Sequence, residues 1–98
     1  MKKLLLFIIF IATALQVTKA QTLDAWVEAG DEALERKDFY SAYKYFGIAL
    51  EYDEDQTDVW YKYAESARQF NIYTKAEMAY TKVIGSDQQA EYPMTAYY

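Results

Sequence analysis

The 98-residue sequence contains no cysteine and no histidine. Without cysteine the chain can form no disulfide, no thiolate metal site and no lipid anchor on a cysteine. Without either residue it also lacks the usual general base and the most reactive nucleophile of enzymes. Its three glycines are scattered and form no phosphate-binding loop. We therefore predict a protein that is not an enzyme and needs no metal or cofactor; an acid–base pair of carboxylates is the one catalytic alternative left.

Residues that interrupt helices are also scarce, because the chain has one proline besides the three glycines. Aromatic residues are abundant, with eleven tyrosines and two tryptophans, and 53% of all residues are hydrophobic. An aromatic-rich chain with so few helix breakers is typical of an all-helical protein.

The N-terminal segment has the three parts of a secretory signal peptide. Two lysines precede an almost unbroken apolar run over Leu4–Leu15, and Thr18 and Ala20 place small residues before a cleavage point. The run is shorter than the roughly 20 residues that cross a bilayer. We predict a signal peptide at residues 1–20 and export to the periplasm or the outer membrane, with no transmembrane segment after cleavage. An uncleaved N-terminal anchor is the alternative.

Charge is unevenly distributed, since the segment before residue 21 holds three lysines and no acid. The remainder has seven basic and fifteen acidic residues, a net charge of −8. Such a chain has little with which to release counterions from a phosphate backbone, which opposes nucleic-acid binding. The same charge favours a basic partner surface.

Trp26 and Trp60 lie 34 residues apart, and the residues around them repeat at the same interval. Residues of similar size recur in five further pairs: Gly30 with Ala64, Ala33 with Ala67, Ala42 with Ala76, Phe46 with Tyr80, and Ala49 with Val83. Self-similarity at this period is typical of stacked helical hairpins, which are binding surfaces far more often than catalysts.

The spacing of apolar residues predicts four helices and the start of a fifth. They cover residues 23–36, 39–52, 58–69 and 74–84, and Pro93 fits the first turn of the fifth. We expect Asp38 to be the N-cap of the second helix. Thr74 with Glu77 matches a capping box at the fourth helix, and Gly85 is expected to adopt a left-handed conformation after it.

This pattern resembles the tetratricopeptide repeat (TPR) family. The resemblance gives one repeat at residues 23–56, a second at 57–90 and the start of a third at 91–98, within a domain covering residues 21–98. The structural positions of the family fall on Trp26, Gly30, Ala42, Phe46, Ala49, Trp60, Ala64, Ala76, Tyr80 and Val83. The resemblance implies an all-α solenoid, in which small residues let the helices approach closely and the tryptophans fill the space that remains between them.

A narrower resemblance covers residues 64–71 and the later pair Tyr92 and Pro93. These residues are similar to the N-terminal repeat region of periplasmic proteins associated with type IX secretion and gliding, which continue into a β-propeller and an OmpA-like peptidoglycan-binding domain. Two repeats and a stub are also fewer than usual for a stable stack. We therefore expect either self-association or continuation into missing C-terminal domains.

The TPR resemblance also implies a concave groove lined by the first helix of each repeat. Its positions are Asp24, Val27, Glu28, Asp31, Leu34 and Glu35, then Asp58, Tyr61, Lys62, Glu65, Arg68 and Gln69. We predict that this groove binds a protein or peptide segment with basic and apolar residues, and that Tyr61 is its exposed aromatic. The function expected is that of a scaffold in an exported envelope protein. An ordinary charged helix face is the alternative.

The acidic connection between the repeats matches part of a calcium loop, since Asp53, Asp55 and Thr57 fall at the first, third and fifth ligand positions. The glycine and the final glutamate of such a loop are replaced by Asp58 and Ala64. We therefore interpret this segment as a solvated turn that also favours the start of the next helix. Most of the tyrosines are expected to line the core with their hydroxyls reaching water.

Overall fold

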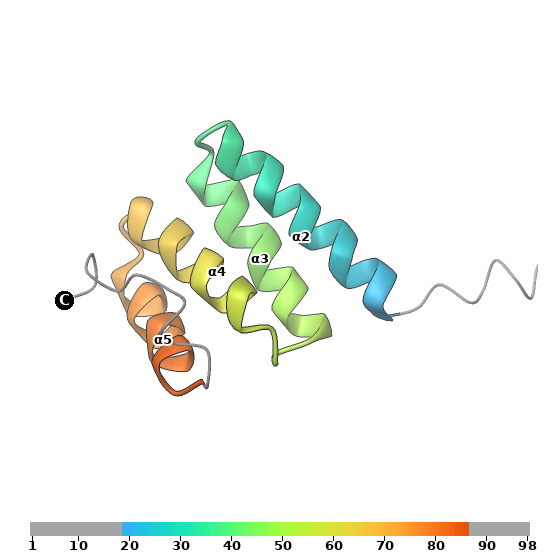
Figure 1. The fold of residues 1–98 in the computed structure, drawn as a ribbon. Helices are drawn as coiled ribbons and strands as arrows, with labels where there is room; N and C mark the ends of the chain where they lie inside the picture. Colours follow the sequence, from blue (N-terminus) through green and yellow to red (C-terminus); the bar gives the residue numbers. More distant parts are fainter. Residues whose placement is uncertain (1–18, 87–98) are drawn as a thin grey trace, which may run out of the picture.

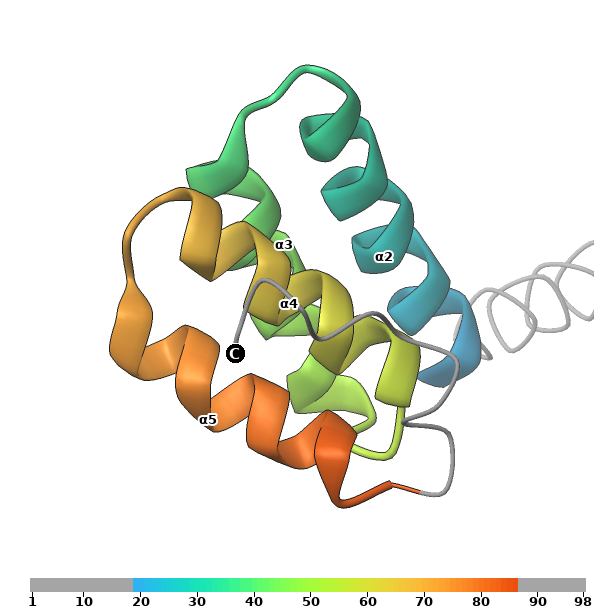
Figure 2. The ribbon, with the colours of Figure 1, turned by 60° about the vertical axis from the view of Figure 1, so that its left-hand side comes forward.

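The computed structural model describes residues 19–86, and within that range the protein is all-helical, as predicted. The helices are α2 (Lys19–Glu35), α3 (Phe39–Tyr52), α4 (Thr57–Gln69) and α5 (Tyr73–Ile84). Each helix packs against the next one in the chain, so that α3 lies between α2 and α4 (Figure 1). The turned view shows α4 and α5 as a second hairpin beside the first (Figure 2).

The helix boundaries agree closely with the sequence pattern, except at the N-terminus. The second predicted helix has the observed bounds of α3, and α4 begins one residue before its predicted start. In contrast, α2 begins at Lys19 rather than near Leu23, because the intervening residues contain no proline or glycine to stop it. The rest of the predicted signal peptide, the third repeat at 91–98 and the helix expected at Pro93 lie outside the described residues.

The two hairpin turns are built in the same way at positions 34 residues apart. Lys37 and Asn71 have positive φ angles of 59° and 67°. The amide of Lys37 donates to the carbonyl of Leu34 at 2.9 Å. The amide of Asp38 donates to the carbonyl of Ala33, five residues earlier, also at 2.9 Å. At the second turn, the equivalent two bonds measure 3.0 and 2.7 Å. This pair of bonds is the Schellman motif, which closes a helix and reverses the chain.

The predicted caps are right at α3 and wrong at α5. Asp38 accepts a hydrogen bond from the amide of Ser41 at 3.2 Å. Hydrogen bonding from the Ser41 side chain, followed by that from its amide, holds the pKa of the Asp38 carboxyl below its usual range. The N-cap of α5 is Ile72, which makes no side-chain cap bond, so the predicted capping box at Thr74 is not formed. The Schellman turn at Asn71 sets this start, because it brings the chain into the helix before Thr74 is reached.

Gly85 also departs from its predicted conformation. It has a φ of −76° in the right-handed region, so it does not supply a left-handed cap after α5. The last turn closes instead with ordinary helical geometry, in which the Gly85 amide donates to the carbonyl of Thr81 at 3.0 Å. Left-handed residues are confined, within residues 19–86, to the two sharp reversals between paired helices.

The core is organised around one large ring in each hairpin, Phe46 on α3 and Tyr80 on α5. Both are essentially fully buried, and they occupy equivalent places in the two hairpins. The small repeat positions around them are also buried, namely Gly30, Ala42, Ala49, Ala64, Ala76 and Val83. The tryptophans were expected to fill the helix interfaces, but Trp26 and Trp60 are only half-buried. An indole remains near the surface because its N–H needs a partner, which for Trp60 is the carbonyl of Glu54 at 2.7 Å.

Equivalent positions of α2 and α4 differ in burial because α4 is covered on two sides. Val59 and Ser66 on α4 are buried, whereas Ala25 and Glu32 at the matching places on α2 are exposed. Tyr63 completes this face of α4, and its ring lies 4.9 Å from that of Tyr43 on α3. The buried hydroxyl of Ser66 is satisfied within its own helix by the carbonyl of Lys62 at 2.7 Å. The face of α4 that docks on α3 is therefore absent from α2.

We predict that Gly30→Ala destabilises the protein, although alanine is the better helix former by about 1 kcal/mol. A Cβ at Gly30 would lie 2.5–2.7 Å from three ring atoms of Phe46, which is fully buried and cannot move aside. Overpacking of this kind costs about 1–3 kcal/mol. The free energy of unfolding, measured by urea denaturation, should fall accordingly. Gly85→Ala is the matched control, because its Cβ would meet its nearest atom at an ordinary 3.5 Å. A Gly30→Ala protein as stable as the Gly85→Ala protein would contradict the close approach of α2 and α3.

Candidate functional site

The residues predicted to line the groove come from two helices that the fold places near each other. Nine of the twelve positions form what we call the α2–α4 surface: Val27, Glu28, Asp31, Leu34 and Glu35 on α2, and Tyr61, Lys62, Glu65 and Arg68 on α4. The other three, Asp24, Asp58 and Gln69, lie on the same two helices and are exposed. All nine are at least partly exposed, and Glu28 and Glu35 are the most open of them. The surface is therefore accessible, but the structure also pairs several of its charges with each other.

An ion pair joins the first helices of the two hairpins. The amino group of Lys62 lies 2.9 Å from a carboxylate oxygen of Asp31, with side chains 34% and 43% exposed. The same amino group lies 6.0 Å from the ring centre of Phe46. Both partners were expected to face a ligand, but here they satisfy each other. An exposed pair of this kind contributes about 0–1 kcal/mol, so it positions α2 against α4 more than it stabilises the fold.

A second charged group lies on α4 itself and continues onto α5. Arg68 donates to Glu65 at 2.7 Å and to the hydroxyl of Tyr80 at 3.3 Å. The hydrogen bond that Arg68 donates to Glu65 raises the pKa of Arg68, and burial raises the pKa of the Tyr80 phenol. Glu65 and Arg68 are thus held in place by each other and by the core ring of the second hairpin.

Tyr61 is more buried than the sequence pattern suggested. We expected an exposed aromatic, but Tyr61 is half-buried and its ring meets that of Tyr80 edge-on, with centroids 6.3 Å apart. Burial, followed by the hydrogen bond that the phenol donates to Glu65 and by the negative charge of Glu65, raises the pKa of the Tyr61 phenol to about 12. The turn of α4 points this ring away from Trp60, as predicted, but towards α5 rather than towards solvent.

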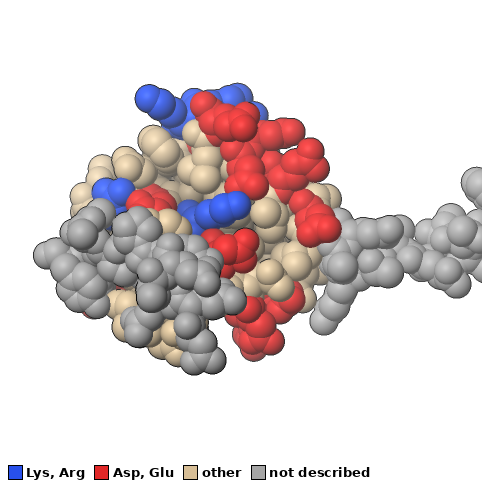
Figure 3. All heavy atoms as spheres, viewed as in Figure 1, with Lys and Arg blue, Asp and Glu red and all other residues tan. Residues whose placement is uncertain are grey.

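A block of charge without ion-pair partners lies on α2. Asp24, Glu28, Glu32 and Glu35 are exposed, and none of them forms an ion pair with another residue of the range 19–86. Spacings of three and four residues place them on one side of the helix. Acidic side chains gather over α2 in the space-filling view (Figure 3). We call this set the α2 acidic row, and beside it Val27 and Leu34 pack against the core.

The acidic connection before α4 is a hydrogen-bonded turn. One carboxylate oxygen of Asp53 accepts from the amide of Asp55 at 3.0 Å, and the other accepts from the side chain of Gln56 at 2.8 Å. Both carboxylate oxygens of Asp53 are therefore engaged within the turn. Across the described part of the chain, no three acidic residues are grouped so as to hold a metal ion. Over the same residues, no helix has the length and apolar character needed to span a bilayer.

No protein-family model, curated protein or solved structure matches this chain. The resemblance to TPR proteins therefore depends on the sequence pattern quoted above.

The raised pKa of Tyr61 predicts a dependence of stability on alkaline pH. Because the folded pKa of about 12 exceeds the ordinary value of 10.0, folding favours the neutral phenol. This contribution is complete below pH 10 and is lost as the pH rises through 12. Tyr61→Phe should therefore lose less stability than the wild type between these values, as measured by urea midpoints. Tyr40→Phe, at a side chain 46% exposed, is the control and should retain the wild-type slope. Equal slopes for all three proteins would contradict the burial of Tyr61.

Proposed function

We propose that residues 21–98 are a non-catalytic protein-interaction module of the TPR kind, which acts as a scaffold in an exported envelope protein. The observation that carries this proposal is the α2 acidic row, which lies beside the partly exposed apolar residues Val27 and Leu34. Export to the periplasm or the outer membrane is proposed from the signal-peptide pattern of the first twenty residues.

The chemistry of this surface favours a partner segment that carries both basic and apolar side chains. Carboxylates without ion-pair partners attract cations and raise the rate of encounter, whereas the apolar contacts supply most of the affinity. The half of the surface on α4 offers less free charge, because Lys62 is paired with Asp31 and Arg68 with Glu65. We therefore place the main electrostatic contact on α2, at Glu28 and Glu35.

This proposal can be tested with two labelled peptides that alternate leucine with either lysine or glutamate, and with fluorescence anisotropy as the measurement. The lysine peptide should bind and the glutamate peptide should not. Glu28→Lys should weaken binding about fivefold, the effect of reversing one exposed charge contact. Glu77→Lys, at an exposed position on α5, changes the net charge equally and should leave the affinity within about twofold. Equal losses in the two variants would mean that net charge alone attracts the peptide.

A second candidate is that the chain is the N-terminal piece of a larger peptidoglycan-anchored, OmpA-like protein of a type IX secretion or gliding machinery. The observation that favours it is the similarity over residues 64–71, which form the end of α4 and the turn that follows. In that case the module is an adaptor, and the envelope anchor lies in domains beyond Tyr98.

The two candidates differ in the size of the native gene product. An antibody against residues 21–98 should detect, in envelope fractions, a band far larger than this chain if the second candidate is correct. A band at the size of residues 21–98 would contradict the second candidate and leave the two repeats acting alone or by self-association. The corresponding cytoplasmic fraction serves as the control for export.

A further inference from the structure

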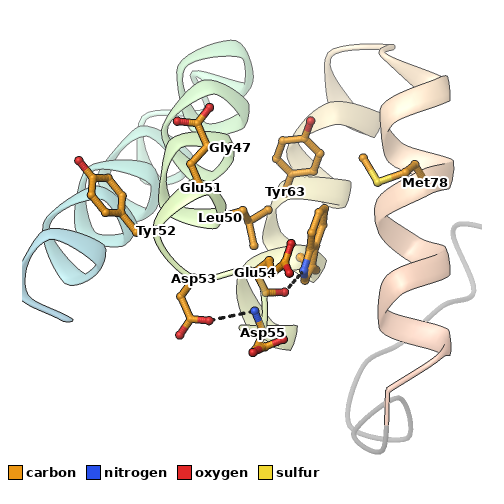
Figure 4. A pocket seen from close by; sticks show the side chains of 10 residues that line it. Gly47, Leu50, Glu51, Tyr52, Asp53, Glu54, Asp55, Tyr63 and Met78 are labelled. Carbon is orange, nitrogen blue, oxygen red and sulfur yellow. Dashed lines mark hydrogen bonds between the residues drawn. The ribbon is translucent and has the colours of Figure 1, made fainter. Parts of the chain in front are cut away.

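A hollow of about 620 Å³ opens between the two hairpins and shares no residue with the α2–α4 surface. Side chains of α3, α4 and α5 and the connection before α4 surround it (Figure 4). Its apolar wall contains Leu50, Trp60, Tyr63 and Met78. The volume falls within the range of roughly 300–1,000 Å³ that is typical of small-ligand sites.

The aromatic part of the wall is held rigidly. The indole N–H of Trp60 donates to the carbonyl of Glu54 at 2.7 Å, which fixes the ring against the connection. Tyr63 meets the same indole edge-on, with centroids 5.9 Å apart and an angle of 81° between the ring planes. The wall is therefore preorganised, and a ligand would not have to order it on binding.

The protein already places a cation against this indole. The amino group of Lys82 lies 5.8 Å from the ring centre of Trp60. Lys82 belongs to a smaller neighbouring hollow, which shares Glu54, Asp55 and Trp60 with the larger one. The indole is the best cation-binding ring among the side chains, because the face of its π-system is negative.

The rim of the larger hollow is acidic. It carries Glu51, Asp53, Glu54 and Asp55, and none of the described residues that line it is a lysine or an arginine. The carboxylate of Asp53 accepts hydrogen bonds from the amide of Asp55 and the side chain of Gln56. Between Lys19 and Ser86, the carboxylates of Glu51, Glu54 and Asp55 form no ion pair. Carboxylates without ion-pair partners thus stand around a fixed aromatic wall, and Lys82 is the cation that lies near it.

We propose that this hollow receives the side chain of an arginine from a partner polypeptide. A guanidinium is planar and stacks on an aromatic face, while its five N–H groups donate in a fork that suits carboxylates. Trp60 and Tyr63 offer the aromatic contact, and Glu51 and Asp55 are exposed carboxylates at the rim. This site goes beyond the proposed function, since it lies apart from the α2 acidic row and does not depend on it.

The test uses the full chain and N-acetyl-arginine amide as the probe, observed by NMR through the two tryptophan indole N–H signals. The Trp60 signal should shift in a saturable manner, whereas the Trp26 signal serves as the internal reference and should not move. N-acetyl-citrulline amide, which has nearly the same shape without the charge, should produce no saturable shift. Glu51→Gln combined with Asp55→Asn should weaken arginine binding about fivefold, since each exposed charge contact contributes a small amount. Glu28→Gln, on the α2 acidic row, should leave it unchanged.

Both rim residues are exposed, so these substitutions should leave the backbone spectrum intact. The proposal is overturned if the Trp60 signal does not move with the arginine probe, or if citrulline moves it equally. It is also overturned if the double variant binds as tightly as the wild type. Because Glu28 is the control here and the test position in the peptide experiment, failure of one proposal is distinguishable from failure of the other.

Discussion

The contact between the ring of Phe46 and the bare backbone of Gly30 determines how closely α2 approaches α3. The ring occupies the volume that any side chain at Gly30 would need, so the two helices are packed at a distance that only glycine permits. In the second hairpin, Tyr80 and Ala64 hold the same positions and are likewise buried. The surface features follow from these cores: Lys62 extends past Phe46 to reach Asp31, and Arg68 reaches the hydroxyl of Tyr80.

The contact between hairpins uses a different set of residues. On α3, Tyr40, Tyr43 and Gly47 form the docking face, where Tyr43 meets Tyr63 and a Cβ at Gly47 would lie 3.2 Å from the same ring. At the matching places on α5 stand Thr74, Glu77 and Thr81, and all three are exposed. The aromatic docking face is therefore not repeated on α5. A helix stacked on α5 would have to use other contacts, and this distinguishes the second hairpin from an interior unit of a regular solenoid.

Much of the fold is encoded by local spacing and was accessible from the sequence. The pairing of Phe46 with Tyr80 and of Gly30 with Ala64 located the core, because helical periodicity places such residues on one face. The cap of α5 was not accessible, since the left-handed turn at Asn71 competes with Thr74 for the helix start and local propensity does not rank the two. Burial of Val59 and Ser66 was also missed. This burial depends on α3 covering a second side of α4. Such a tertiary contact cannot be read from the residue pattern of a single repeat.

The sequence predicts which positions line the candidate site, but it does not predict which of their charges pair with each other. Sequence position alone counts Asp31, Lys62, Glu65 and Arg68 as free charges, whereas the structure neutralises them in pairs. What remains is the row on α2, where Asp24 and Glu28, and Glu28 and Glu32, are like charges four residues apart. Such pairs destabilise a helix by a few tenths of a kcal/mol each, roughly 0.2–0.5. The basic partner proposed for this surface would offset that cost. The rim of the hollow is acidic for a different reason, because there the carboxylates come from the end of α3 and the connection, around an indole whose N–H is held by the carbonyl of Glu54.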